Sequence, residues 1–172
     1  KIPLIIKGEI PLNKSENLDL RLSGDGKILE LIDNFTNEFF TFKKGDLNLR
    51  MILKGTINKP ILNGFIVIKD SEIDLFKNKI IDINSSIIFD FESLEIENLQ
   101  AMSEDTGKFL VKGSMPFYQN KSKSGQINFQ TNKFNVKTDN LNFLLDSDLD
   151  LSGSFENPVL GGYLSLNNGF FK

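Results

Sequence analysis

The amino-acid sequence predicts an all-β fold, an elongated sheet of antiparallel or mixed strands with one short helix. Three observations support this prediction. Apolar and polar residues alternate over many short runs, turn-forming residues separate these runs, and two long motifs each occur twice. Alternation is the pattern of strands with one buried face, and regularly spaced turns are typical of all-β architectures.

The alternation has a period of two residues, which places apolar side chains on one face of a sheet and polar ones on the other. Such one-faced strands are typical of antiparallel sheets. The runs are residues 18–22, 47–53, 87–91, 94–96, 127–129, 134–136, 141–145 and 149–151.

Residues that favour turns separate the runs at intervals of roughly 8–12 residues, which predicts about a dozen short strands. Gly, Pro, Asn, Asp and Ser dominate these sites because they accept or favour turn conformations. The predicted turns are 24–26, 45–46, 58–60, 70–71, 84–86, 105–107, 124–125, 138–140, 157–158 and 167–169.

One segment has the period of a helix instead. Ile28, Leu31, Ile32 and Phe35 follow the i, i+3, i+4, i+7 pattern of an amphipathic helix. We therefore predict a short helix over about 26–37. A helix this short is marginal on its own in water, so we expect it to lie on the apolar face of the sheet.

Composition excludes several classes of site. The chain has 172 residues, a formal net charge of −3, and no His or Cys. His- or Cys-based metal sites, thiol nucleophiles, disulfides and Ser-His-Asp triads are therefore absent. The net negative charge argues against nucleic-acid binding, and no apolar run reaches the roughly 18 residues of a membrane-spanning helix. The start at Lys1 predicts a segment of a longer protein.

The sequence contains an imperfect internal repeat. Residues 55–68 return as residues 153–166, at an offset of 153 − 55 = 98, and residues 6–12 return as residues 111–117, at an offset of 113 − 8 = 105. In each copy of the longer motif a strand ends at Gly, and a new strand starts after a turn of the form Gly-x-x-x-x-Pro. Such self-similarity is typical of extended repeat architectures. We predict one segment, 1–172, made of two units, roughly 1–105 and an incomplete 106–172.

The apolar face raises a functional question, because one short helix cannot cover about a dozen strands. Two interpretations remain open: the apolar residues are the ordinary core of a closed β domain, or the sheet curls and they line an apolar groove that holds lipid. The candidate groove residues are Leu18, Leu20, Leu22, Leu49, Met51, Leu53, Ile66, Ile68, Phe89, Phe91, Phe129, Val136, Phe143, Leu149, Leu151, Leu164 and Leu166.

Paired carboxylates are the candidates for catalysis or Ca²⁺ binding. Asp146 and Asp148 share a strand face, as do Glu95 and Glu97, and Asp70 and Glu72 lie in or near a predicted turn. All of them occupy the polar phase of the alternation or a turn, where a solvated charge is the usual role. We therefore expect no catalytic residue, no metal and no cofactor, and hence no enzyme.

The order of motifs resembles the family of the translocation and assembly module subunit TamB, in its cyanobacterial and chloroplast-envelope branch. The resemblance covers essentially the whole chain. It is carried by residues 7–12, the alternating strand that follows, residues 26–32, 44–49 and 55–65, and then 80–84, 94–99 and 107–113. It implies a long sheet curled like a taco around an apolar trough.

The resemblance also implies a role. Proteins of this family are anchored in the inner membrane and cross the periplasm, or the chloroplast intermembrane space. They carry phospholipid acyl chains between membranes and support outer-membrane protein assembly with a partner of the Omp85 type. An alternative is a protein-interaction scaffold, in which an open sheet edge at residues 162–171 accepts a strand of an outer-membrane assembly factor.

Overall fold

A computed structural model describes the backbone of most of the chain. The described residues are 4–13, 15–28, 30, 40–76, 78–104, 107–119, 124–138 and 140–171. The predicted helix over about 26–37 lies for the most part outside these residues.

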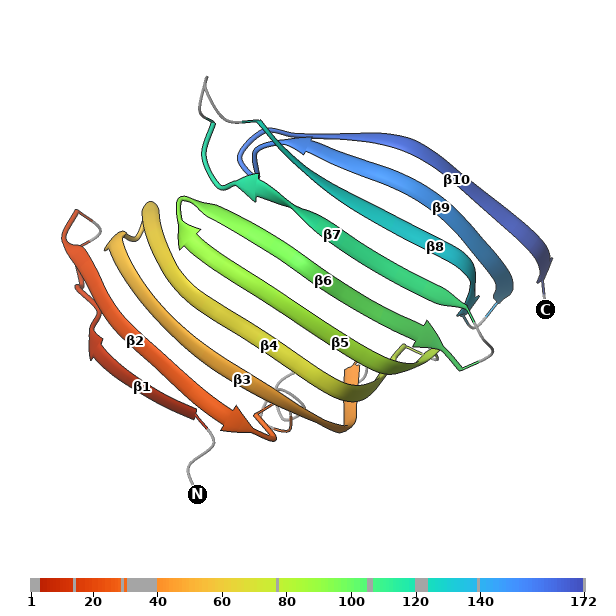
Figure 1. Cartoon of the computed structure of the whole chain (residues 1–172), viewed down its shortest axis with the longest axis horizontal. Coiled ribbons are helices and arrows are strands. Elements are labelled where there is room, and N and C mark those ends of the chain that lie inside the picture. The colour runs from red at the N-terminus through yellow and green to blue at the C-terminus, as the bar shows by residue number, and fades with distance from the viewer. Residues whose placement is uncertain are drawn as a thin grey trace.

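Ten strands make up the described part of the chain (Figure 1). Several are longer than the short strands that the sequence predicts. They are β1 (Leu4–Glu9), β2 (Asn17–Gly26), β3 (Phe40–Thr56), β4 (Lys59–Leu75), β5 (Asn78–Phe91), β6 (Ser93–Ser103), β7 (Lys108–Pro116), β8 (Gly125–Lys137), β9 (Leu141–Gly153) and β10 (Pro158–Phe171).

The strands form one sheet in which each strand pairs with its neighbours in sequence, in the order β1 to β10. Every pairing is antiparallel, so the sheet has none of the parallel pairs that a mixed sheet would contain among the described strands. β1 and β10 are the two edges, at opposite sides of the curved sheet in Figure 1. The prediction of an all-β curled sheet is confirmed, and the closed two-layer alternative is wrong for the described residues.

Local sequence explains the hairpins. β3 and β4 are joined through Asn58 ahead of Pro60, and β9 and β10 through Asn157 ahead of Pro158. Pro lacks an N–H to donate, so it is tolerated near the start of a strand. Both predicted turns are therefore confirmed.

Five other predicted turns are wrong, because they lie inside strands: 45–46 in β3, 70–71 in β4, 84–86 in β5, 167–169 in β10, and 24–26 in the last residues of β2. The first, second and fourth coincide with shifts of register, and the third borders one. The backbone has positive φ angles at Asp70 (46°), Asp82 (52°), Lys133 (48°) and Asn168 (51°), each within such a shift. These sites are β-bulges, and the strand continues through them. The described part of the sheet therefore has ten strands, most of them longer than predicted, rather than about a dozen short ones.

The bulges of β4, β5 and β8 lie in one row across the sheet. Ser71 pairs with Ile83 next to the β5 bulge, and Phe109 pairs with Thr131 beside the β8 bulge. In β3, Gly45 belongs to the same row, and a Cβ there would lie 2.0 Å from the Ser71 Oγ. Bulges bend strands and increase their twist. The strands bend near this row (Figure 1), and the bend curls the sheet.

Candidate functional site: the apolar trough

The strand register places the predicted groove residues on one face of the sheet. Across β8, β9 and β10, for example, Phe129 pairs with Leu149, and Leu151 pairs with Leu160. Directly paired residues share a face, and so do residues two apart along a strand. Followed from β2 to β10, this rule puts all seventeen predicted residues on the same face, which we call the apolar face.

The burial of these seventeen residues varies with position in the sheet. Most are half-buried, whereas Leu18 is buried and Phe91, Leu164 and Leu166 are exposed. No second sheet covers this face in the described part of the chain. The half-burial therefore comes from neighbouring side chains and from the curl of the sheet.

The centre of the apolar face is filled. Val111, Met115 and Ile127 form a buried cluster over β7 and β8. Phe129 and Leu151, two of the predicted groove residues, pack against this cluster. These two side chains therefore belong to a closed core, while the apolar face remains more open on either side of it.

Beyond the row of bulges, the apolar face encloses a pocket of about 350 Å³ whose accessible lining is wholly apolar. β4 and β5 form one wall, β8 and β9 the other, and β6 and β7 lie between them. The lining residues are Ile73, Leu75, Ile80, Ile83, Leu99, Ala101, Phe109, Thr131, Phe134, Val136 and Leu145.

Of these lining residues, only Val136 is among the groove residues predicted from the sequence. The bulges reset the alternation, so a period counted through Asp70 or Asp82 assigns the following residues to the wrong face or to a separate strand. One sequence signal could have found them: an Asp, Asn or Lys that separates two alternating runs where no Gly or Pro is present. Such a residue is compatible with a bulge as well as with a turn.

Hydrogen bonds hold the two walls of this pocket together. The side chain of Asn78, at the start of β5, donates to the Lys137 carbonyl of β8 at 3.0 Å, and the Lys137 N–H donates back to the Asn78 Oδ1. β6 and β7 lie between these strands, which would separate them by about 14 Å in a flat sheet. The Asn78 contact therefore requires a strong curl past the β6–β7 turn.

A second pair of hydrogen bonds supports the same closure. The Ser103 Oγ accepts from the Gly107 N–H at 3.0 Å and from the Asn135 N–H at 3.3 Å. A Cβ at Gly107 would lie 2.3 Å from the Lys133 carbonyl oxygen, so only glycine permits this close approach of β8.

At the other end of the strands, residues 116–119 cross several strand ends. The Phe117 ring stacks on Phe89 and Phe155, with centroids 6.4 and 5.7 Å away. The Tyr118 hydroxyl donates to the Pro60 carbonyl of β4 at 2.8 Å. Burial raises the pKa of Tyr118 above its ordinary value, and the carboxylates of Glu156 and Glu92 raise it further.

The opposite face carries the carboxylates considered above. Asp148 accepts hydrogen bonds from the Asn128 amide at 2.8 Å and from Gln130 at 3.4 Å, and Asp146 accepts from the Lys133 N–H at 2.7 Å. Hydrogen bonds from Asn128 and Gln126 hold the pKa of Asp150 below its usual value. Amide and backbone donors thus satisfy these aspartates.

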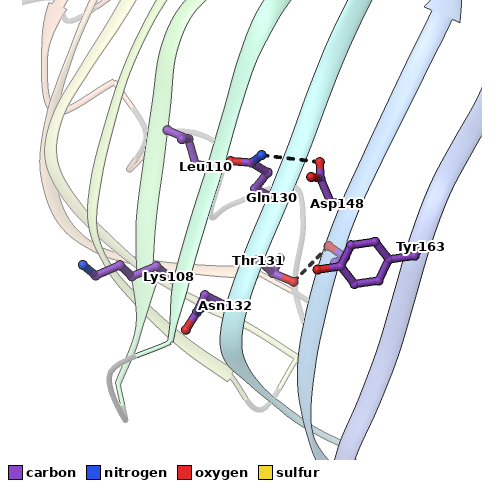
Figure 2. A pocket seen from close by; sticks show the side chains of 8 residues that line it. Lys108, Leu110, Gln130, Thr131, Asn132, Asp148 and Tyr163 are labelled. Atoms are coloured by element: carbon purple, nitrogen blue, oxygen red, sulfur yellow. Dashed lines mark hydrogen bonds between the residues drawn. The ribbon is translucent and has the colours of Figure 1, made fainter.

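A hollow of about 320 Å³ lies on this opposite face. Asp148, Gln130, Lys108 and Tyr163 lie around it (Figure 2). Nearby, the hydroxyls of Thr131 and Ser147 lie 2.9 Å apart. Among the described residues, no three acidic side chains converge in a way that could hold a metal ion. This face is not uniformly polar, because it also exposes Ile5, Ile52, Ile61, Phe65, Val159 and Tyr163.

The chain is similar to the protein TIC236, chloroplastic, of Arabidopsis thaliana, with 24% identity over 160 residues. The match covers 88% of this chain and 7% of that protein, so the chain spans only a small part of the relative's length. It supports a distant TamB-like relationship. No family model matches the chain, and no solved structure matches it. In the part of the chain that the structure describes, no helix is both long and apolar enough to span a bilayer.

Proposed function

We propose that the apolar face binds acyl chains of phospholipid and that the chain serves as one segment of a longer lipid-carrying trough. The observation that carries this proposal is the wholly apolar pocket in the curl of a single sheet. Its volume lies near the lower end of the roughly 300–1,000 Å³ typical of ligand pockets. The pocket would hold one part of an acyl chain, and the rest would lie along the neighbouring half-buried residues.

Physical chemistry favours retention of the lipid without trapping it. Each methylene group that leaves water contributes about 0.8 kcal/mol. A bilayer interior offers nearly the same gain, so transfer of an acyl chain from membrane to trough is close to neutral. Such a trough holds lipid against water and still releases it to a membrane.

The similarity to a chloroplastic protein is compatible with a role in envelope biogenesis. We propose that the chain acts between two envelope membranes, in a periplasm or chloroplast intermembrane space, within a protein anchored in the inner membrane. In this proposal the chain is not an enzyme and needs no cofactor.

Adjacent residues of β9 offer a matched test. Leu145 lines the pocket, whereas Leu144 lies on the opposite face, and both are half-buried. We expect Leu145→Glu to lower the affinity for a spin-labelled fatty acid at least tenfold, because a charge in the pocket opposes burial of methylenes. Leu144→Glu should bind like the wild type.

A second variant tests whether lost binding could result from misfolding. Val136→Phe fills the pocket without adding charge, and we expect it to keep the wild-type circular dichroism spectrum while it lowers fatty-acid binding. Unchanged binding in both Leu145→Glu and Val136→Phe would contradict the proposed function.

A second function rests on a different observation, the open β10 edge. β10 has no charged residue, and no second strand pairs with it in the described part of the chain. Unpaired backbone groups at such an edge accept a further strand. We propose that this edge supports binding of an outer-membrane assembly protein of the Omp85 type. We expect the Leu164→Lys variant to lose capture of this assembly protein. The Ile6→Lys variant, changed at the β1 edge, should still capture it. Equal capture by both would contradict it.

A further inference from the structure

The two edges of the sheet differ in how well they are protected. β1 is six residues long and carries Lys7 and Glu9, whereas β10 has 14 residues, none of them charged, and Pro only at its first position. Short length, charge and proline are the usual protections of an edge strand. β10 lacks all three along its length, and its apolar-face residues Leu160, Leu164 and Leu166 are more than half exposed.

The internal repeat identifies β10 as the counterpart of β4. Gly64 pairs with Met51 and Gly162 with Leu149, and both pairs differ by the offset of 98. The φ angles are positive at both glycines, 146° and 112°. A Cβ would lie 2.0 Å from the Arg50 carbonyl oxygen at Gly64, and 2.1 Å from the equivalent Asp148 oxygen at Gly162. The β3–β4 and β9–β10 hairpins thus share register and local geometry.

The structure shows what covers β4. β5 pairs with it so that Phe91 lies opposite Leu62, Phe89 opposite Gly64 and Ile87 opposite Ile66. An aromatic ring opposite glycine fills the space that a missing side chain leaves, and such cross-strand pairs stabilise sheets. Leu62 and Ile66 are half-buried in this arrangement.

The same offset defines the expected partner of β10. We propose that β10 binds a β-hairpin with the chemistry of β5–β6, residues 78–103, in antiparallel register. An aromatic residue would lie opposite Gly162, an aromatic one opposite Leu160 and a branched aliphatic one opposite Leu164. This pairing buries the exposed apolar residues of β10 and satisfies its outward backbone groups.

The repeat also explains why the partner is a hairpin and not the β1 edge of a second copy. Gly8 of β1 corresponds to Gly113 of β7, and both have a φ of 129°. β7 follows β6 in the sheet, so two strands, β5 and β6, separate a β4-type strand from a β1-type strand. This proposal concerns the β10 edge and does not depend on acyl-chain binding. It rests on the second proposed function, binding of a partner strand at β10, and adds the residue types that this strand should carry.

The test uses a synthetic peptide of residues 78–103 and the full chain. The chain has no cysteine, so one engineered cysteine on each partner reports register through a disulfide. We expect the Leu164→Cys chain to cross-link under mild oxidation to a peptide with Ile87→Cys. A peptide with Ser86→Cys, whose side chain points to the other face, should cross-link at least tenfold less.

Controls separate the other outcomes. Ile6→Cys, which is equally exposed on the apolar face of the β1 edge, should give no cross-link above background. Amide hydrogen exchange of the unmodified chain should slow in β10 when the unlabelled peptide is added. Equal yields for both peptides, cross-linking at Ile6→Cys, or dimers of the Leu164→Cys chain in place of the peptide adduct would overturn the proposal. The capture assay with Leu164→Lys uses the assembly protein and not this peptide. A failure of the peptide experiment can therefore be told apart from a failure of the second proposed function.

Discussion

Two copies of one sequence motif occupy opposite environments in this sheet. In β7, at the centre, Val111 and Met115 are 2% and 0% exposed, whereas their counterparts Ile6 and Ile10, at the β1 edge, are 58% and 65% exposed. Gly8 and Gly113 nevertheless share a φ of 129°. The motif therefore sets backbone conformation and facing, and the number of neighbouring strands sets burial.

The chain after each of these strands, β1 and β7, differs in the same way. After β7, Phe117 stacks on two rings and Tyr118 bonds to β4. After β1, the counterpart Leu12 is fully exposed. The central copy thus ties distant strand ends together. If this comparison is right, equivalent substitutions will have unequal effects.

The largest difference is expected for core truncation. Met115→Ala should lower the free energy of unfolding by about 2–5 kcal/mol, because it leaves a cavity in the Val111–Ile127 cluster. Ile10→Ala should change it by less than about 0.5 kcal/mol. Urea unfolding followed by circular dichroism measures both values, and equal losses would refute the comparison.

A smaller difference is expected at the paired glycines. A Cβ would lie 2.2 Å from the Gln126 carbonyl oxygen at Gly113 and 1.8 Å from that of Asp19 at Gly8. Gly113→Ala should destabilise the whole sheet by more than about 1 kcal/mol, since φ is positive there and neighbours on both sides hold the strand. Gly8→Ala should instead release β1 alone. Amide exchange separates these results: fast exchange confined to β1 is expected only for Gly8→Ala.

The smallest effect concerns Tyr118. Tyr118→Phe removes the hydrogen bond to Pro60 and should lower stability by about 0.5–1.5 kcal/mol at neutral pH. Leu12→Ala, in the equivalent segment after β1, is the control and should have no measurable effect. Urea unfolding again provides the measurement, and an equal loss in Leu12→Ala would count against the tying role of residues 116–119.

The change in folding stability with pH tests the direction of the Tyr118 pKa shift. The pKa of Tyr118 is higher in the folded chain than in the unfolded chain. The contribution of the neutral tyrosine to folding stability is therefore fully present below the unfolded pKa of about 10, and it is lost as pH rises through the folded pKa. Between about pH 9 and 12, the wild type should therefore lose more stability than Tyr118→Phe does. The opposite difference in slope would show that the folded chain favours the tyrosinate.

The shared face of the apolar residues could be predicted from the sequence, because period two places residues such as Leu149 and Ile66 on one face without knowledge of their partners. The bulges could not be predicted in the same way. Asp and Asn accept a left-handed backbone in turns and in bulges alike. Whether the chain reverses at Asp70 or continues depends on the strands beside it. The pocket was missed for this reason, since its walls lie beyond the bulges.

The strand pattern, the facing of the side chains and the equivalence of β4 with β10 follow from local sequence, because alternation and glycine requirements act along the chain. Which apolar residues are enclosed depends instead on the packing of the whole sheet. Leu62 and Leu160 have the same local sequence role, but β4 has a strand on each side and β10 has one. Burial depends on contacts with strands distant in sequence, and no local pattern contains that information.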